Sequence, residues 1–467
     1  MATTEIIIGP PGTGKTTRLL DIMENEIKNG VEPNKISFCS FTKKAADEAA
    51  DRACERFNFK KSDLIYFRTI HSLAFQSLGL KKDQVMQPKD YKFIGKHLGL
   101  DFSNGFDFVQ ESGMGRKNGD QYAFIDSFSR ARHMTAKTVW DMVNHDSLNW
   151  FEFKRYASTV IDYKKQKNLY DFADMLQFGE AKIDVDVLII DEAQDLSTAQ
   201  WYFIERSFPN VKRIYIGGDD DQAIFEWGGA DVDKFINLQG NRTVLDKSYR
   251  IPNAVHTVAT DISGKIKHRS EKTYHSKDEK GSVEYWMNVD DIDMSSGTWL
   301  LLARNSYLLG EYMVTVKSKG HTFTSKGNNS IYAADVKAIT LWEKYRKGLT
   351  LSEKEVELLN DYTNWDKSLI WHEAFTKMSF ESRQYYVSLL RRGESLTKPP
   401  RITISTIHGS KGGEADHVVL LSDMAYNTWE SSNMNSDSEH RVWYVGATRA
   451  KESLNIIMPR GRYNYAI

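Results

Sequence analysis

The sequence predicts an α/β protein with two parallel sheets flanked by helices, each sheet interrupted by a mainly helical insertion. A glycine-rich loop at residues 9–16 stands between an apolar run and a helical stretch, the strand–loop–helix order of a phosphate-binding unit. Short apolar runs recur along the chain and are typical of strands in buried parallel sheets. Two long polar stretches of helical periodicity, residues 76–180 and 331–395, separate these runs. The 467 residues are enough for about three domain-sized units.

The first predicted sheet takes its strands from both sides of the first insertion. Residues 5–57 form a β-α-β-α pattern with strands at 6–8 and 36–41, and alanines follow one face of the second helix. Residues 185–190 form an almost continuous apolar strand, and residues 213–216 form another. We therefore assign residues 1–75 and 181–250 to a first domain and residues 76–180 to its inserted subdomain.

A second α/β series begins near residue 251. Its predicted strands are residues 282–286, 299–303, 402–405 and 417–421. The charged helical stretch within the series ends at Lys398-Pro399-Pro400, a strong break in helical structure. The second domain is therefore predicted to comprise residues 251–330 and 396–467, with a shorter insertion at residues 331–395.

Composition restricts the classes of partner and the compartment. Lys and Arg number 62 against 63 Asp and Glu, so the net charge of −1 predicts no partner, and any nucleic-acid site must be a local stripe. No apolar run approaches the roughly 18 residues of a membrane span, and the first strand leaves no place for a signal peptide. The two cysteines, Cys39 and Cys54, lack metal-ligand spacing. These features indicate a reduced, cytoplasmic compartment.

The loop Gly9-Pro10-Pro11-Gly12-Thr13-Gly14-Lys15-Thr16 has the G-x-x-x-x-G-K-T spacing of a nucleoside-triphosphate site, and Thr17 follows it in the helix. Its glycines let backbone N–H groups converge on phosphates, and the helix N-terminus adds partial positive charge. We expect Lys15 to reach the β- and γ-phosphates and the Thr16 hydroxyl to ligate Mg²⁺. The loop therefore predicts binding of ATP or GTP with magnesium.

Acidic and amide side chains follow the next two strands of the first domain. Asp191 and Glu192 follow the strand at residues 185–190, at the sheet edge where ligands bind. Such pairs are common on surfaces, but beside a phosphate loop the pair favours catalysis, with Asp191 holding Mg²⁺ through water and Glu192 deprotonating the attacking water. Gln222, after the strand at residues 213–216, could hydrogen-bond the γ-phosphate or that water and so sense ATP against ADP. The alternative for Gln222 is an ordinary acidic turn.

Motifs that run in order from residue 9 to residue 449 resemble those of superfamily 1 DNA helicases of the UvrD/Rep type. Besides the phosphate loop and the acid pair, they are residues 41–46, 69–72, 218–230, 248–250, 406–414 and 444–450. Any one of them is a weak signal, whereas their shared order is highly specific. The resemblance covers nearly the whole chain apart from the two insertions. It implies two RecA-like P-loop domains and an ATP hydrolase that acts on DNA in replication, repair or recombination.

The resemblance implies further roles at the nucleotide. Arg250 and Arg449 would be arginine fingers supplied from the second domain, because a planar guanidinium neutralises charge that develops on the phosphates. Tyr249 would stack on the adenine, and Glu414 would accept a hydrogen bond from the ribose. The alternative for the two arginines is an ordinary surface position.

A path for single-stranded DNA is also implied. Phe41, Phe225 and Trp227 are the stacking candidates, because aromatic faces bind every base alike. The candidates for hydroxyl or ring N–H contacts to phosphate or sugar are Thr42, Thr69, His71, Thr406 and His408. The two histidines could instead be structural. The basic side chains of the first insertion, which would contact duplex DNA or form a solvated helix face, are Arg130, Arg132, His133, Lys154, Arg155, Lys164, Lys165 and Lys167.

The chain departs from the family pattern in four places. Eight residues precede Gly9, which leaves no room for the family's adenine-reading glutamine loop, so we expect weaker discrimination between ATP and other triphosphates. Gly228 stands where the family usually has arginine, and Ser248 replaces an asparagine. The second insertion is short, so the autoinhibition attributed to it in the family is not carried over. The compact size suits a phage-encoded or minimal cellular member.

The resulting hypothesis is an ATP-dependent single-stranded DNA translocase and DNA helicase. It would act as a monomer on single strands and single-strand/duplex junctions in the cytosol of a bacterium or a phage-infected host. The resemblance implies 3′→5′ polarity. The alternative is a DNA-stimulated ATPase that remodels nucleoprotein complexes without processive unwinding. A helicase-nuclease is disfavoured because no further carboxylate-rich metal site is recognised, and a metabolite kinase is disfavoured by the two arginine fingers.

Overall fold

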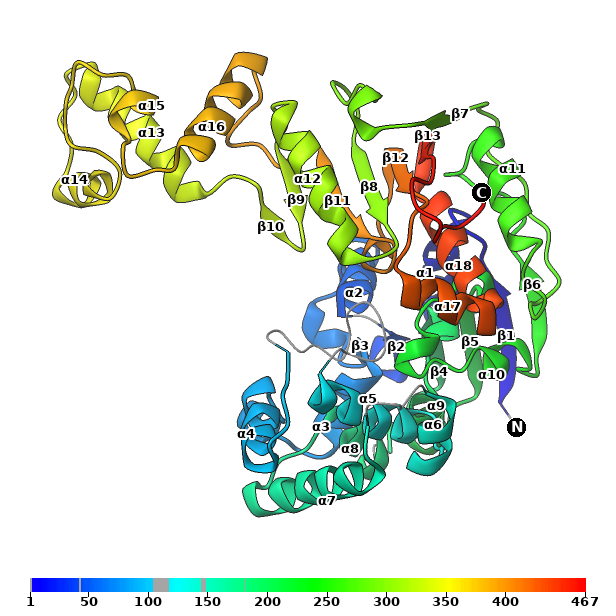
Figure 1. Cartoon of the computed structure of the whole chain (residues 1–467). Coiled ribbons are helices and arrows are strands. Elements are labelled where there is room, and N and C mark those ends of the chain that lie inside the picture. Colours follow the sequence, from blue (N-terminus) through cyan, green and yellow to red (C-terminus); the bar gives the residue numbers. More distant parts are fainter. Residues whose placement is uncertain (1, 42, 104–116, 144–147, 181) are drawn as a thin grey trace. The chain divides into compact units, whose positions relative to one another are not determined.

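The computed structural model describes residues 2–41, 43–103, 117–143, 148–180 and 182–467. The chain forms two compact units (Figure 1), the first of Met1–Glu279 with Met434–Val445 and the second of Lys280–Asn433 with Gly446–Ile467. The expected domain boundary near residue 250 thus falls inside the first unit. The chain beyond residue 250 stays with that unit because Arg269 and Ser270 bond the carboxylates of Asp221 and Asp220.

A six-stranded parallel sheet, in the order β3-β2-β4-β5-β1-β6, forms the centre of the first unit. Its strands are β1 (Thr3–Ile8), β2 (Ile36–Ser40), β3 (Phe67–Thr69), β4 (Val187–Asp191), β5 (Arg213–Gly218) and β6 (Asn241–Val244). Every residue of β2 and β4 is buried, which explains their apolar sequences. Along β1, Ile6 and Ile8 enter one core cluster and Ile7 enters another, so both faces of the sheet are covered.

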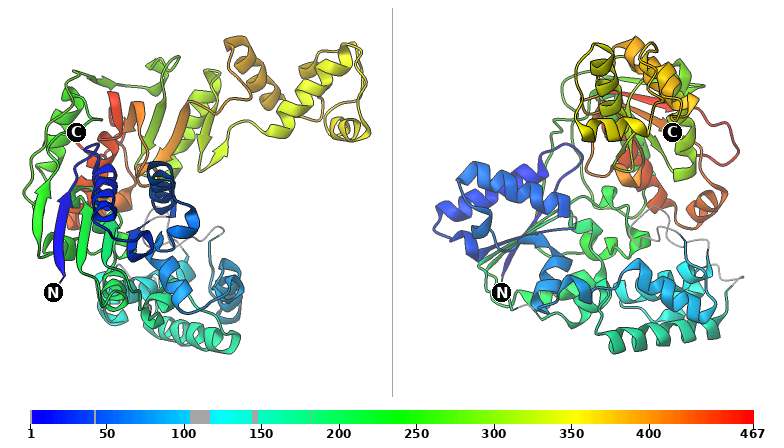
Figure 2. Two further views of the ribbon diagram at one scale, coloured as in Figure 1. Left: turned by 180° about the vertical axis from the view of Figure 1, so that it is seen from behind. Right: turned by 90° about the vertical axis from the view of Figure 1, so that its left-hand side faces the viewer.

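Helices pack on both faces of this sheet (Figure 2). On the Ile7 face lie α1 (Lys15–Lys28) and α2 (Lys43–Phe57), whose leucines and alanines join that core. On the other face lie α3 (Ile70–Ser77), α8 (Phe172–Phe178) and α9 (Thr198–Ser207). The other helices that belong wholly or largely to the unit outside the insertion are α10 (Val232–Ile236), α11 (Asn253–Ser263) and α18 (Ser436–Ala447).

In its described residues the first insertion is mainly helical, with one isolated β-bridge between Val85 and Tyr170. Apart from α8 and the end of α3, its helices are α4 (Pro88–Leu98), α5 (Asn118–Ala131), α6 (Ala136–Met142) and α7 (Trp150–Lys167). They enclose an aromatic core of their own that includes Tyr122, Trp140 and Tyr156. The insertion is therefore a packed subdomain.

The second unit contains a seven-stranded sheet in the order β10-β9-β11-β8-β12-β13-β7. Its strands are β7 (Ser282–Trp286), β8 (Trp299–Ala303), β9 (Phe323–Ser325), β10 (Asn328–Asn329), β11 (Ile402–Thr406), β12 (Ala415–Leu421) and β13 (Ala450–Ile457). All pairings are parallel except that of β10 with β9. Two helices lie outside the insertion, α12 (Leu309–Ser318) and α17 (Tyr426–Met434).

The second insertion projects away from its sheet (Figure 1). Its helices are α13 (Ala333–Arg346), α14 (Glu353–Asn360), α15 (Trp371–Ala374) and α16 (Phe380–Arg392). They pack around Trp342, Phe375 and Tyr386. The predicted α/β class with parallel sheets flanked by helices is thus confirmed. Within the described residues, no helix combines the length and the apolar character that a membrane span needs.

Candidate functional site

The phosphate loop connects the end of β1 to the start of α1. Gly12 and Gly14 have φ angles of 73° and 79°, the left-handed region that favours glycine. At Gly9, a Cβ atom would lie 2.6 Å from the Cβ of Lys15, so no side chain fits there. Because α1 begins at Lys15, the loop lies at a helix N-terminus, where backbone N–H groups and the helix dipole favour an anion.

Four predicted catalytic and magnesium-binding side chains meet at this loop. The Lys15 ammonium bonds the Asp191 carboxylate and lies 2.6 Å from Glu192 Oε1. The Thr16 hydroxyl donates to Asp191 Oδ2 over 2.8 Å. Burial alone would lower the pKa of Lys15, but the charges of Asp191 and Glu192 outweigh burial and raise it above the ordinary lysine value. Lys15 therefore stays positively charged, and its ammonium group lies beside the carboxyl end of β4.

Glu192 is held in an uncommon conformation. Its φ of 55° lies in the left-handed region, which costs a residue with a Cβ on the order of 1–3 kcal/mol. The side chain accepts a hydrogen bond of 2.6 Å from Gln194 Nε2, and Gln194 Oε1 accepts one of 3.1 Å from the Asp219 backbone N–H. Gln194 is fully buried and so joins the acid pair to the loop after β5. Sequence reasoning gave it no role, although its place two residues after the pair was visible.

Gln222 lies in that next loop, whose 3₁₀ turn spans Asp220–Gln222. Its side-chain amide donates to Asp219 Oδ2 over 2.8 Å. Burial, together with the negative charges of Asp219 and Asp220, raises the pKa of Asp221 to about 6 against the opposing effect of Lys272. The loop is therefore acidic and buried. Hydrogen bonds through Asp219 and Gln194 connect the side-chain amide of Gln222 to Glu192.

The segment that carries Tyr249 and Arg250 lies against the phosphate loop within the first unit. Ser248 Oγ donates to the Pro11 carbonyl over 2.8 Å, and the Tyr249 backbone N–H donates to the Gly12 carbonyl over 2.8 Å. A Cβ at Gly12 would lie 2.4 Å from the Arg250 Cβ. Tyr249 is 75% exposed. Arg250 thus belongs to the same unit as the loop, whereas the family resemblance implied the second domain.

Four other predicted site residues belong to the second unit. Arg449 is buried, and its Nη1 lies 3.4 Å from the Gly413 carbonyl. Glu414 forms an ion pair of 2.8 Å with Lys451. Thr406 is buried and accepts a hydrogen bond from the Gly409 backbone N–H, and His408 is buried beside it. Their roles toward nucleotide and DNA stay predictions.

The three predicted stacking rings form one cluster. The rings of Phe41 and Phe225 stack with centroids 5.2 Å apart, and Trp227 meets Phe225 edge-on at 6.2 Å. All three rings are partly exposed, as a base-stacking surface requires. Phe225 and Trp227 follow Gln222 in the same loop, so the side-chain amide and the two rings are close in sequence.

The predicted polar strand contacts of the first unit have structural partners. Thr69 caps α3, its hydroxyl accepting from the Ser72 backbone N–H over 3.2 Å. His71 lies edge-on to Phe172, with its Nδ1 3.5 Å from Gln200 Nε2. Burial lowers the pKa of His71 to about 4, which keeps the ring neutral. This environment favours the structural alternative for His71. Thr42 lies outside the described residues.

The basic residues of the first insertion differ in their burial and in their partners. Lys164 is buried in ion pairs of 2.6 and 2.7 Å with Asp171 and Asp174, and Arg130 binds the same two carboxylates. For Lys164 and Arg130 the expectation of a DNA-contacting or solvated surface is therefore wrong, because acids of α8 and its cap neutralise both. The exposed members are His133 and four side chains of α7, Lys154, Arg155, Lys165 and Lys167. Arg132 is half-buried and donates to the Ala230 carbonyl over 2.7 Å.

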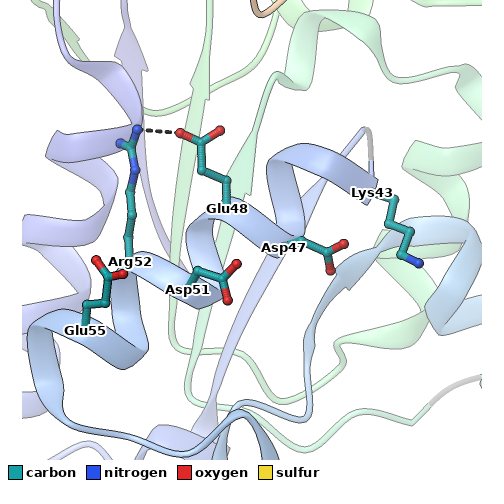
Figure 3. Close-up of a pocket in the computed structure, with 6 residues that line it drawn as sticks. All are labelled: Lys43, Asp47, Glu48, Asp51, Arg52 and Glu55. Carbon is teal, nitrogen blue, oxygen red and sulfur yellow. Dashed lines mark hydrogen bonds and ion pairs between the residues drawn. The ribbon is translucent and has the colours of Figure 1, made fainter. Parts of the chain in front are cut away.

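A surface pocket on α2 has a different character (Figure 3). It is lined by Lys43, Asp47, Glu48, Asp51, Arg52 and Glu55. Four of these six side chains are carboxylates, and Glu48 forms an ion pair with Arg52. An acidic helix face repels phosphate, so this pocket does not compete with the loop after β1 as a nucleotide site.

Comparisons with known proteins match the chain to one family. The model of the UvrD/REP helicase N-terminal domain matches residues 1–242, and that of the UvrD-like helicase C-terminal domain matches residues 123–461. A probable DNA helicase II homolog of Rickettsia conorii is 24% identical over 357 residues, which cover 67% of this chain and 51% of that protein. A probable DNA helicase of Mycoplasma pneumoniae is 24% identical over 484 residues, 97% of this chain and 80% of that protein.

The chain spans about half the length of the Rickettsia relative that it matches. The ATP-dependent DNA helicase PcrA of Staphylococcus epidermidis is 24% identical over 298 residues, 57% of this chain and 38% of that protein. Among solved structures, a complex of arterivirus nonstructural protein 10, a helicase, with DNA is 12% identical and covers 98% of this chain and 62% of that one. The TM-score between the two structures is 0.36.

Proposed function

Because this chain belongs to the UvrD/REP helicase family, we propose that it is an ATP-dependent translocase on single-stranded DNA that unwinds duplex DNA. One observation carries the proposal. A continuous set of hydrogen bonds runs from Lys15 through Glu192, Gln194 and Asp219 to Gln222. Three residues after Gln222 the base-stacking cluster begins. Hydrolysis and strand binding thus share one loop.

The chemistry at the loop after β1 is hydrolysis of the γ-phosphate. When ATP binds, Lys15 exchanges its contacts with Asp191 and Glu192 for phosphate oxygens, which releases Glu192 to accept a proton from the attacking water. Gln222 contacts the γ-phosphate or that water and reports the difference between ATP and ADP. Arg250 and Arg449 supply positive charge to the transferred phosphoryl group. Tyr249 stacks on the base and Glu414 binds the ribose.

The residues at the loop suit Mg²⁺ as the accompanying cation. The Thr16 hydroxyl and the Asp191 carboxylate are oxygen donors only 2.8 Å apart, and Mg²⁺ takes one or two such protein ligands beside phosphates and water. In the described ranges, no group of three or more His, Cys, Asp or Glu side chains is arranged to hold a metal. When bound, the cation neutralises charge on the β- and γ-phosphate oxygens.

Phe41, Phe225 and Trp227 form the base-stacking part of the strand site, which makes binding tolerant of sequence. Thr42, Thr69, Thr406 and His408 add contacts to phosphate or sugar. The enzyme translocates 3′→5′ and acts as a cytosolic monomer at single-strand/duplex junctions in replication, repair or recombination. The two free cysteines suit a reduced compartment.

A strand-displacement assay tests the proposal against its alternative, a DNA-stimulated ATPase that remodels nucleoprotein complexes. The substrates are duplexes with a 3′ or a 5′ single-stranded tail, and the Lys15→Ala variant is the control. The proposal expects ATP-dependent displacement of the 3′-tailed duplex by the natural protein and none by the variant. DNA-stimulated hydrolysis without displacement of either duplex would support the remodelling ATPase instead.

A further inference from the structure

The loop that carries Gln222 is held by two cations, buried Lys272 and half-buried Arg269, from a distant segment of the chain. Asp219, Asp220 and Asp221 are all fully buried. Lys272 places its Nζ 2.8 Å from Asp219, 2.6 Å from Asp220 and 3.2 Å from Asp221. Arg269 binds Asp221 through two nitrogens. These two cations offset two of the three negative charges, so one positive charge is still missing from the balance.

A third cation, Arg441 of α18, enters the same region and is 2% exposed. It bonds backbone atoms there, because its Nε donates to the Asp220 carbonyl over 2.9 Å and its Nη2 donates to the His268 carbonyl over 2.6 Å. The Asp220 carbonyl also accepts from the Ala223 backbone N–H over 3.2 Å. Arg441 therefore holds the turn that positions Gln222, through its hydrogen bond to the Asp220 carbonyl.

The remaining arm of Arg441 reaches the stacking cluster. Its Nη1 lies 3.5 Å from Glu226 Oε2, and Glu226 stands between Phe225 and Trp227. This contact is longer than the two backbone bonds, and the Glu226 side chain is 26% exposed. A planar guanidinium with several donors suits such a bridge, because one rigid group holds three acceptors at once. Of the three contacts of Arg441, the one with Glu226 is therefore the one that changes most easily.

We propose that Arg441 is a positioning residue that couples strand binding to ATP hydrolysis, by joining the turn around Gln222 to the turn between Phe225 and Trp227 through Glu226. The inference rests on the proposed function. A base that enters between the rings displaces the Glu226 turn, and the guanidinium transmits this displacement to the Asp220 carbonyl and so to Gln222. Strand binding thereby changes the position of the amide at the nucleotide.

The test measures the ratio of ATP turnover with saturating oligo-dT to turnover without it. The variants are Glu226→Ala, Arg441→Lys and their combination, and Glu205→Ala is the matched control. Glu205 is an exposed glutamate of the same unit that pairs with Lys234 over 2.7 Å, away from Arg441. Glu226→Ala leaves the two backbone bonds of Arg441 in place, so it tests the coupling even where Arg441→Lys fails to fold.

The proposal expects the ratio to fall about fivefold or more in Glu226→Ala, the lower end of ordinary coupling between sites, and to stay unchanged in Glu205→Ala. The double variant should be no worse than Arg441→Lys alone, because both changes break one bridge. An unchanged ratio in Glu226→Ala overturns the proposal. So does a parallel loss of both turnover rates, which indicates a merely structural role. If the natural protein shows no stimulation by DNA, the proposed function itself fails.

Discussion

Replacing Lys272 by methionine should strongly destabilise the first unit. The side chain of Lys272 is 1% exposed and faces three carboxylates, the closest being Asp220 at 2.6 Å. Burial alone would lower the pKa of Lys272, but the neighbouring carboxylates raise it above the ordinary lysine value, so the residue is charged across the working pH range. Methionine keeps a similar length and volume and removes the charge.

The size of the loss in stability depends on which partners the three carboxylates keep after Lys272 is replaced. Asp221 keeps Arg269, Asp220 keeps the Ser270 backbone N–H at 2.7 Å, and Asp219 keeps the Gln222 amide at 2.8 Å. Removing one partner of a buried ion pair costs about 3–5 kcal/mol, and the retained hydrogen bonds argue for the lower part of that range. Lys272 lowers the pKa of both Asp220 and Asp221, so without it these two pKa values rise in the folded state. The folded state then binds more protons than the unfolded state, so the loss of stability shrinks as pH falls from 7 to 5.

Urea unfolding followed by tryptophan fluorescence and circular dichroism measures this loss. The matched control is Lys35→Met, since Lys35 also lies 2.6 Å from a carboxylate, that of Asp184, but this pair is solvent-exposed. The control should unfold near the wild-type midpoint. Equal midpoints for Lys272→Met and Lys35→Met, or a loss that does not depend on pH, would refute the reasoning.

Three further outcomes are expected. Lys15→Ala should reduce ATP turnover at least about 100-fold, because it removes a preorganised cation from the phosphates, and a residual rate within tenfold of wild type would contradict that role. Trp227→Ala should weaken binding of oligo-dT in fluorescence anisotropy by about 1–3 kcal/mol, the value of one stacked base, and an unchanged affinity would remove Trp227 from the site. Because the pKa of His71 falls from its ordinary value near 6.5 to about 4 on folding, the natural protein should lose stability as pH falls through that window. His71→Gln should lose less between pH 7 and pH 5 in thermal unfolding, and equal losses would count against a buried neutral His71.

The parts of the site that local sequence predicts are those built from a strand and the residues directly after it. The phosphate loop follows an apolar run, and Asp191 ends another. Because the carboxyl ends of parallel strands meet at one edge, such patterns are enough to bring Lys15, Thr16 and Asp191 together. The α/β class follows from the same apolar runs.

Charged residues whose partners are distant in sequence could not be predicted. Lys272 and Arg441 are 52 and 221 residues from Asp220, and no local periodicity connects them. Lys164 illustrates the opposite error. It stands among lysines of α7 that are exposed, yet its own side chain points toward Asp171 and Asp174 and is buried. Helical charge patterns report composition, whereas the tertiary packing decides which charge is buried.

The most direct test of the central claim, that one loop serves both hydrolysis and strand binding, is steady-state ATP hydrolysis with and without single-stranded DNA. The natural protein and Glu192→Gln are compared, since Glu192 is proposed as the base and Gln cannot accept the proton. The account predicts turnover that rises several-fold with DNA in the natural protein and is lost under both conditions in the variant. Turnover that is indifferent to DNA in the natural protein would contradict it.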